Sequence, residues 1–304
     1  MFKENKERFI STINVEQYPY KYWDNLFKKV EPIEEMYDKD LFDFSKKEII
    51  GLYKYFDTKS FDYLLVMNFN LIKYAQWALQ EALIKDGQNH FSELTNEEIY
   101  ECINKFGMEE SIITRERLES IINTIASARD RFILIALFEG IKGKSFCELI
   151  NANINDIDFN KKKMKLSTGR VVDVSDTLIA IAKEANLEET YVAASGKKTY
   201  KLYGDVGSLY KSIRKDPSEA NEIKIVGKII RNILDTHGVS KYVTANTIFT
   251  SGLIHRINQF ADQDDTTAQE VLSNEEHLEY LKNQYGYNKV LTYKFLFRYK
   301  NFLR

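Results

Sequence analysis

The chain has 304 residues, of which 44% are hydrophobic and 29% charged, and its formal net charge at pH 7 is −2. This length allows a sizeable core divided between two domains, and the near-neutral charge excludes a uniformly basic nucleic-acid binder. The chain contains no run of eighteen apolar residues, and its N-terminus lacks the apolar stretch of a signal peptide. We therefore expect a cytoplasmic protein without a membrane span, whose two cysteines form neither a disulfide nor a zinc site.

The first hundred residues indicate a helical domain. Residues 45–48 begin with serine and end with glutamate, the pattern of a capping box at a helix start, and residues 95–98 repeat it with threonine. Between them, apolar residues recur at helical spacing over 64–78, which predicts a long helix that ends near Gly87.

Residues 107–113 are the best candidate for a linker between domains. Thr114 follows as a predicted N-cap, and a new run of helical pattern begins after it. We therefore predict a first domain over residues 1–107 and a second over residues 113–304.

The most informative stretch covers residues 129–158. An apolar helix ends there at Gly140, and a short basic turn that contains Lys142 and Lys144 follows it. A second amphipathic piece at 147–150 then leads into the sequence Asn-Asp-Ile-Asp. The chain thus predicts a helix, a basic turn, a short helix and the entry into a different kind of structure.

The helical period breaks over residues 157–174. Three short runs there favour strands, and Gly169 suits a hairpin turn that needs a positive φ. Ser175 predicts the N-cap of the next helix, and we expect helices again from Gly207 onward, interrupted at residues 216–217 and 237–238. The predicted fold class is mainly α with a small β-sheet.

Together these motifs resemble the tyrosine recombinase (phage integrase) family. In that family a helix ends in Gly-Leu-Arg, a Ser-Glu-Leu helix follows, and Asp-Ile-Asp precedes a small sheet, which is similar to residues 132–158 here. The resemblance implies a helical core-binding domain followed by a recombinase catalytic-like domain. The chain also looks similar to the integrase-like lysogeny repressors of SPβ-group Bacillus phages.

The resemblance implies a chemistry whose residues are replaced in this chain. The family uses two arginines and further histidine and lysine groups to neutralise the scissile phosphate. At the first arginine the nearest residues here are Lys142, Lys144 and Ser145. In the second motif, His-x-x-Arg, Asn246 stands for histidine and Phe249 for arginine.

The third motif has likewise changed. Tyr287 replaces the family's histidine, and the position of the nucleophilic tyrosine falls on Leu296. Tyr293 and Tyr299 lie three residues to either side, and we expect both to be aromatic residues that pack the last helix. The sequence therefore predicts no catalytic residues, no metal and no cofactor.

Basic residues are unevenly spread along the chain. Residues 161–231 hold 15 Lys/Arg against 9 Asp/Glu, and residues 284–304 hold five basic residues and no acidic one. A DNA-binding protein needs a basic face rather than a basic total. We expect phosphate contacts from Lys142, Lys144 and Arg170. We expect base contacts from Asn246 and Thr247.

The leading hypothesis is an inactive, recombinase-like transcription regulator that binds double-stranded DNA. Two alternatives stay open: a divergent active recombinase that uses Tyr293 or Tyr299, and a protein-interaction module that does not bind DNA. Further partners considered are a protein regulator and a second copy of the chain. The second copy would dock through the apolar last helix, and docking of that helix on its own domain is slightly favoured.

Overall fold

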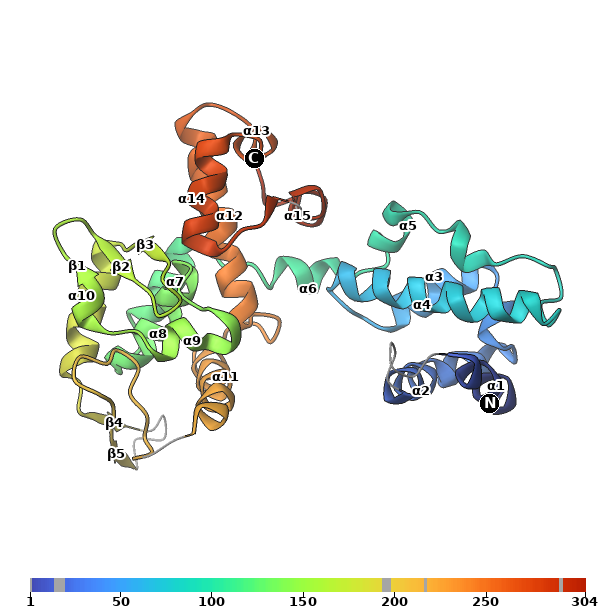
Figure 1. Ribbon diagram of the computed structural model, residues 1–304, viewed down its shortest axis with the longest axis horizontal. Helices are drawn as coiled ribbons and strands as arrows, with labels where there is room; N and C mark the ends of the chain where they lie inside the picture. Colours follow the sequence, from blue (N-terminus) through green and yellow to red (C-terminus); the bar gives the residue numbers. More distant parts are fainter. Residues whose placement is uncertain (1, 14–19, 193–197, 216–217, 290–291) are drawn as a thin grey trace. The chain divides into compact units, whose positions relative to one another are not determined.

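The computed structural model describes residues 2–13, 20–192, 198–215, 218–289 and 292–304. The chain divides into two compact units, Met1–Met108 and Glu109–Arg304. Both are mainly helical, and the second also carries two small antiparallel sheets (Figure 1). The predicted fold class, mainly α with a small β-sheet, is therefore confirmed.

The first unit is built from helices and short 3-10 turns. In chain order they are α1 Lys3–Thr12, α2 Tyr20–Tyr37, η1 Leu41–Asp43, α3 Lys46–Tyr55, α4 Phe61–Gln80, η2 His90–Glu93, α5 Asn96–Tyr100 and α6 Lys105–Glu109, which reaches one residue into the second unit.

Aromatic side chains from α1, α2 and α4 fill the core of the first unit. The ring of Phe9 meets the edge of Trp23 at a centroid distance of 4.9 Å, and Phe27 meets Tyr74 at 5.0 Å. Trp77 stacks on Tyr74 at 5.8 Å. Both tryptophans of the chain thus lie in this unit, where they are buried.

Both predicted capping boxes are present in the first unit. The side chains of Ser45 and Thr95 accept from backbone N–H groups three residues on, and glutamates complete the boxes. The long helix α4 ends at Gln80, before the predicted end at Gly87, because Ala82 turns into the left-handed region at φ 53°.

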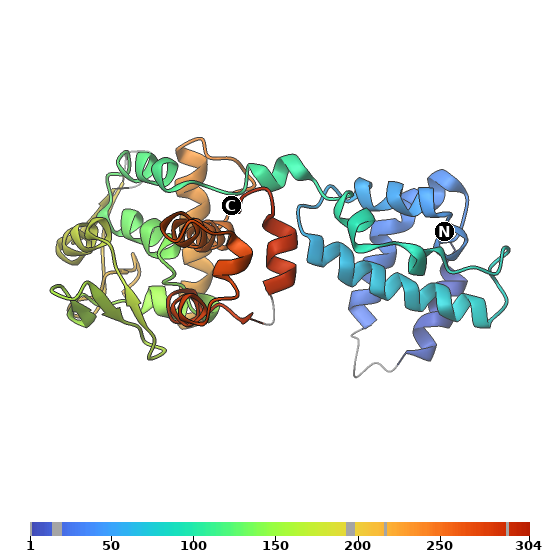
Figure 2. The same ribbon diagram turned by 90° about the horizontal axis from the view of Figure 1, so that it is seen from above.

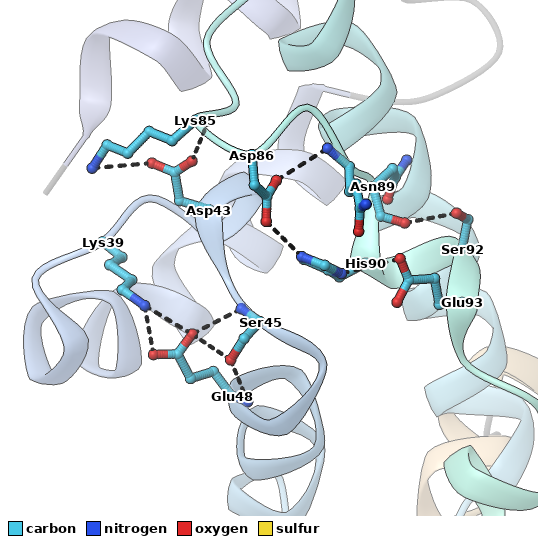
Figure 3. A network of polar contacts seen from close by, with 11 residues as sticks. Lys39, Asp43, Ser45, Glu48, Lys85, Asp86, Asn89, His90, Ser92 and Glu93 are labelled. Carbon is cyan, nitrogen blue, oxygen red and sulfur yellow. Dashed lines mark hydrogen bonds and ion pairs between the residues drawn. The ribbon is translucent and has the colours of Figure 1, made fainter.

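Polar contacts hold the segment that follows α4. His90 lies between two carboxylates, 2.7 Å from Asp86 and 3.1 Å from Glu93. The backbone N–H of Lys85 donates to Asp43 in η1 at 3.2 Å (Figure 3). The bond from Lys85 satisfies a backbone N–H outside the regular helices, and the contacts of His90 tie the two ends of this segment together.

The second unit has the order helix, sheet, helix. Its elements are α7 Arg115–Ile122, α8 Ala128–Phe138, η3 Lys144–Phe146, α9 Cys147–Ile150, η4 Ile154–Asp156, β1 Ile157–Asp158, β2 Lys163–Lys165, β3 Val171–Asp173, α10 Asp176–Leu187, β4 Thr190–Val192, β5 Thr199–Lys201, α11 Glu219–Thr236, α12 Ala245–Gln263, α13 Ala268–Val271, α14 Glu275–Tyr285 and α15 Thr292–Tyr299.

Helix α8 forms the centre of the second unit. Its residues 132–138 are all apolar and buried, and α7, α10, α11 and α12 pack against it (Figures 1 and 2). Gly252 allows α12 to approach closely, since a Cβ atom there would lie 1.7 Å from the carbonyl oxygen of Phe138. Gly140 ends the segment at φ 90°, and a Cβ atom there would lie 2.2 Å from the carbonyl oxygen of Gln284. Helices α12 and α14 are thereby fixed next to the end of α8.

The predicted strands form one antiparallel sheet in the order β1-β2-β3. Met164 pairs with Ile157 on one side and with Val172 on the other. Gly169 has φ 87° in the turn, as predicted. Ser175 caps α10 through the N–H of Leu178, also as predicted.

Two features of the second unit differ from the sequence-based expectation. Strands β4 and β5 form a second hairpin that was not predicted, because each is three residues long and lacks a buried position. The helix expected from Gly207 begins only at Glu219, after irregular chain with an isolated bridge between Tyr203 and Ser212. The expected break at 216–217 lies outside the described residues.

Candidate functional site

The structure brings together two positions that the recombinase resemblance assigns to arginines. The ammonium group of Lys142, which follows α8, lies 5.0 Å from the ring centroid of Phe249 in α12. Lys142 is half-buried, and burial lowers the pKa of its ammonium group. A cation over an aromatic face is attracted by the ring's quadrupole. One cation and one ring thus occupy the place where the resemblance implies two guanidinium groups.

The third motif supplies more aromatic side chains to the same place. Tyr285, at the end of α14, meets the ring of Phe249 edge to face at 5.6 Å. Its hydroxyl donates to the carbonyl oxygen of Phe138, and burial raises the pKa of this phenol. Tyr287 is 9% exposed and donates its O–H to Thr292. The three motifs therefore converge, and aromatic rings dominate where they meet.

Arg170, a predicted phosphate contact, is engaged within the protein. Its Nε and Nη2 donate to the two carboxylate oxygens of Glu148 at 2.9 and 2.6 Å. Nη2 also donates to the carbonyl oxygen of Gly140, and Nη1 donates to that of Asn283, both at 2.9 Å. Arg170 thereby fastens the hairpin turn to α9 and to the segments after α8 and near the end of α14.

Glu148 is the acidic partner in this arrangement and is 2% exposed. Burial by itself would raise the pKa of Glu148, yet the bonds from Arg170 and Thr168 outweigh it and lower that pKa. The backbone N–H of Lys142 donates to the same carboxylate at 3.3 Å. Glu148 therefore remains ionised and links Lys142 to the hairpin.

Two lysines at this end of the unit are exposed. Lys144 lies in η3, and Lys165 lies at the end of β2. The hydroxyl of Ser167 in the hairpin turn donates to the carbonyl oxygen of Cys147, the residue directly after η3. Within the part of the chain that the structure describes, neither lysine forms an ion pair.

Sequence reasoning missed Lys165. The sequence could have indicated this residue, because side chains of a strand point alternately to opposite faces and Met164, its neighbour in β2, is buried. Lys165 therefore faces solvent, just before the hairpin turn. The neighbouring lysines of this hairpin differ, since Lys162 pairs with Asp176 at 2.7 Å and Lys163 with Asp173 at 2.8 Å.

Asn246 and Thr247, the predicted base-reading residues, lie in the first turn of α12. Thr247 accepts from the backbone N–H of Thr244 at 2.8 Å and donates to its carbonyl oxygen at 3.1 Å. Its hydroxyl is thus used in a capping box. Asn246 is exposed and lines an open pocket beside Phe146.

The two tyrosines near the chain end differ in exposure. Tyr293 is 68% exposed and stacks on Phe297 of its own helix at a centroid distance of 6.3 Å, whereas Tyr299 is half-buried. Leu296, at the nucleophile position, packs against the C-terminal core cluster. The carbonyl oxygen of Arg304 accepts from the N–H of Ala268 at 2.7 Å, so the chain end docks on its own unit.

Two further features bear on the site. Among the residues that the structure describes, no group of three or more histidine, cysteine, aspartate or glutamate side chains is placed to hold a metal ion. None of the described helices is both long enough and apolar enough to span a membrane.

A helical unit, followed by a unit in which residues of the three motifs meet, defines a recombinase-like scaffold. Family models match both parts: "MrpR, N-terminal core-binding domain" matches residues 1–80, and "MrpR, C-terminal catalytic domain" matches residues 112–303. The chain belongs to the MrpR family. The predicted resemblance to tyrosine recombinases, with a core-binding domain followed by a catalytic-like domain, is confirmed.

A relative in Bacillus subtilis (strain 168) supports the predicted phage connection. The chain is 26% identical over 274 residues to "SPbeta prophage-derived uncharacterized protein YopR", a match that covers 84% of this chain and 81% of that protein.

Solved structures with a similar chain path include three recombinases. The lambda integrase (75–356) dimer bound to a COC' core site is 16% identical, with a TM-score of 0.46 over 92% of this chain and 94% of that one. The Tn1549 transposon integrase in complex with circular intermediate DNA is 12% identical, with a TM-score of 0.47 over 96% and 94%. XerA recombinase is 14% identical, with a TM-score of 0.39 over 96% and 92%.

Proposed function

We propose that this protein is a sequence-specific, double-stranded-DNA-binding transcription regulator, repressor-like and of phage origin, that acts in the host cytoplasm without cleaving DNA. Its recombinase-like scaffold supplies the shape, and the residues at the three motifs determine what it can do. The SPbeta prophage origin of the Bacillus subtilis relative supports the phage assignment.

The contact between Lys142 and Phe249 is the observation that carries this proposal. Phosphoryl chemistry needs several fixed positive charges around the scissile phosphate, since negative charge develops there in the transition state. A phenylalanine ring supplies no such charge. In addition, the contact holds the half-buried Lys142 against the ring, and Arg170 already binds a carboxylate. The residues at the two arginine positions thus provide one ammonium group and no guanidinium group, which supports binding of DNA without phosphoryl chemistry.

The exposed lysines nearby suit phosphate binding without chemistry. Lys144 and Lys165 are exposed on segments joined by the bond from Ser167 to Cys147, and the half-buried Lys142 lies two residues before Lys144. Phosphate contacts of this kind supply affinity, and side chains in the groove supply specificity. We assign base reading to the exposed Asn246 and a supporting role to Thr247, which shapes the start of α12. Arg170 contributes chiefly by holding the hairpin in place.

A DNA-binding assay tests this function. The DNA upstream of the protein's own reading frame is the first target, and affinity is measured at rising salt concentrations. Each lost phosphate contact lowers the slope of log affinity against log salt by about 1. We expect this loss for Lys144→Ala and Lys165→Ala, and no loss for the matched control Lys162→Ala, whose partner is Asp176. Equal binding by the double variant and the wild type would overturn the assignment of this face.

A second assay tests the alternative of an active recombinase. The exposed Tyr293 is a candidate nucleophile in that alternative. Nicked suicide substrates that carry the bound site trap any covalent adduct between protein and DNA. We expect none. An adduct that disappears in Tyr293→Phe or Tyr299→Phe would show that the protein retains strand cleavage.

We further propose that a second copy of the chain docks on α15, and that a protein regulator is a further partner. No residue of α15 is fully buried, although its side chains are largely apolar. Light scattering of the wild type and of Tyr293→Glu, each free and on DNA, measures the oligomeric state. Tyr293 is exposed, so this substitution leaves the core intact. A wild type that stays monomeric in both states would contradict docking between copies.

A further inference from the structure

The second unit contains an open pocket to which the proposed function gives no role. It has a volume of about 230 Å³ and lies between the turn η3, helix α11 and the first turn of α12. Phe146, Ile230, Leu234 and Ala245 give it apolar walls. For comparison, an apolar cavity of roughly 150 Å³ is large enough to bind benzene.

A glycine in the middle of α11 keeps this pocket open. Gly227 lines the pocket, and a Cβ atom at this position would have no heavy atom within 4 Å. A glycine inside a helix is unfavourable relative to alanine because its backbone loses more freedom on folding. Neither close packing nor a positive φ requires a glycine at position 227. The open space of the pocket beside Gly227 explains why a residue without a side chain stands there.

The opposite wall of the pocket is strained. Ser145 and Phe146 are consecutive residues with φ values of 53° and 65°, in the left-handed region that side chains other than glycine seldom adopt. Such strain gathers at ligand sites and switch segments, where the surroundings hold it in place. The strained turn also carries Lys144, so the wall of the pocket and a candidate DNA contact belong to one segment.

The polar groups at the pocket favour an anion. The N–H groups of Ala245 and Asn246 have no acceptor within α12, since they belong to its first turn, and the helix dipole adds positive potential there. Arg231 lies one turn after Gly227 on α11 and also lines the pocket. Its Nη2 donates to the carbonyl oxygens of Lys241 and Val243, which fixes the guanidinium beside the helix start.

One acidic side chain stands near this edge. Asp235 accepts from Nη1 of Arg231 at 3.3 Å, and its side chain is 59% exposed. Asp235 is not among the residues that line the pocket, and none of those residues is acidic. The pocket thus combines an apolar body with a positive end.

We propose that this pocket binds a small apolar carboxylate, with its ring or branched chain between Phe146 and Ile230 and its carboxylate at the start of α12 near Arg231. An occupied pocket also weakens DNA binding, an effect that rests on the proposed function. Asn246 borders both the pocket and the candidate DNA face, and the strained turn joins the pocket to Lys144. A bound ligand would therefore compete with DNA for this edge.

The probe is 3-phenylpropionate, and its uncharged amide is the comparison. Titration calorimetry on the full chain without DNA should show saturable binding on the order of 1 mM. The amide should bind at least ten times more weakly, because it cannot use the positive end of the pocket. Equal binding of acid and amide would overturn the assignment of a carboxylate ligand.

Gly227→Leu is the decisive variant, since its Cβ atom would have no heavy atom within 4 Å and the rest of its side chain would take up space in the pocket. We expect the fold to be retained by circular dichroism and the affinity for the probe to fall at least tenfold. Lys228→Leu, which adds the same side chain to the next, exposed position of α11, is the matched control and should bind as the wild type does. Unchanged probe binding by Gly227→Leu would refute the site.

The regulatory part has a separate readout. DNA affinity is measured with and without saturating probe, for the wild type and for Gly227→Leu. A several-fold loss in the wild type alone supports regulation, and an unchanged affinity of a probe-loaded wild type overturns it. A wild type that binds the probe and no DNA at all would remove the proposed function and this regulation with it, while the ligand site would stand on calorimetry.

Discussion

Each unit of this molecule contains a nearly inaccessible glutamate that pairs with a base, Glu34 in the first and Glu148 in the second, and the two carboxyl groups respond to burial in opposite ways. In the second unit, Glu148 pairs with Arg170, and the pKa of its carboxyl group is lowered. In the first unit, Glu34 pairs with Lys6, and burial raises the pKa of its carboxyl group to about 7. Both glutamate side chains are almost completely inaccessible.

The difference follows from the number of donors around each carboxylate. Glu148 accepts two bonds from Arg170, one from Thr168 and one from the backbone of Lys142. Glu34 accepts from the Lys6 ammonium group and from the backbone N–H of Leu41 at 3.2 Å. It also lies near Asp40, whose charge raises the pKa of Glu34 further. A buried carboxylate thus stays ionised when a bidentate arginine and further donors surround it.

The largest expected effect concerns the arginine pair. Arg170→Met leaves Glu148 buried without its partner, which costs about 3–5 kcal/mol of unfolding free energy. Hydrogen exchange should increase first in residues 139–150 and 170–174, the segments that Arg170 joins. Lys165→Met, at the exposed end of the same hairpin, is the control and should change stability by about 0.5 kcal/mol at most. Equal effects of the two substitutions would contradict the fastening role of Arg170.

The next effect is a pH dependence confined to the first unit. The pKa of Glu34 is about 7 in the folded state against 4.5 in the reference state, so the folded state binds the extra proton between these values. Stability of this unit therefore rises as pH falls from about 7 to 4.5, by about 2–3 kcal/mol. Tryptophan fluorescence in urea at a series of pH values isolates the unit, because Trp23 and Trp77 both lie in it.

Glu34→Gln should flatten most of this dependence. Asp40, whose pKa is raised by burial, adds a smaller change of the same sign below the Glu34 window. A slope that survives Glu34→Gln unchanged would show that Glu34 is ionised across the whole range.

Removing the base of the first pair tests the same contrast from the other side. Lys6→Met should cost about 2 kcal/mol at pH 8, less than Arg170→Met, because Glu34 takes up a proton instead of remaining as an unpaired charge. At pH 5, where Glu34 is already protonated, the loss should be smaller. Urea unfolding followed by tryptophan fluorescence measures both values, and a larger loss at pH 5 than at pH 8 would be inconsistent with this explanation.

The smallest expected effect comes from the polar contacts in Figure 3. Bonds to Asp86 and Glu93 raise the pKa of His90 above 6.5 in the folded protein. The contribution of His90 to the free energy of unfolding is therefore fully present below pH 6.5, and it is lost as pH rises through the pKa of the folded state. These groups are partly exposed, so the effect is about 0.5 kcal/mol. His90→Asn should remove it at pH 5.5 and change little at pH 8.5, as measured by thermal unfolding. A larger loss at the higher pH would contradict the sign.

The sequence by itself determined the local features of the fold. The capping boxes at Ser45 and Thr95, the apolar helix α8 and the turn at Gly169 all follow from residues a few positions apart, because helix caps, helical periodicity and tight turns are local. Sequence also determined the correspondence between motifs: it left Lys142, Lys144 and Ser145 as candidates at the first arginine position and placed Phe249 at the second.

The tertiary structure alone decided which of these residues meet and which remain accessible. Lys142 and Phe249 are 107 positions apart, and their contact exists because Gly252 allows α12 to pack directly on α8. Arg170 is engaged by Glu148 and by carbonyl groups that the hairpin reaches only after folding, whereas Lys165 and Tyr293 remain exposed. Periodicity shows that a residue lies on an element, but partners and exposure depend on packing between segments distant in sequence.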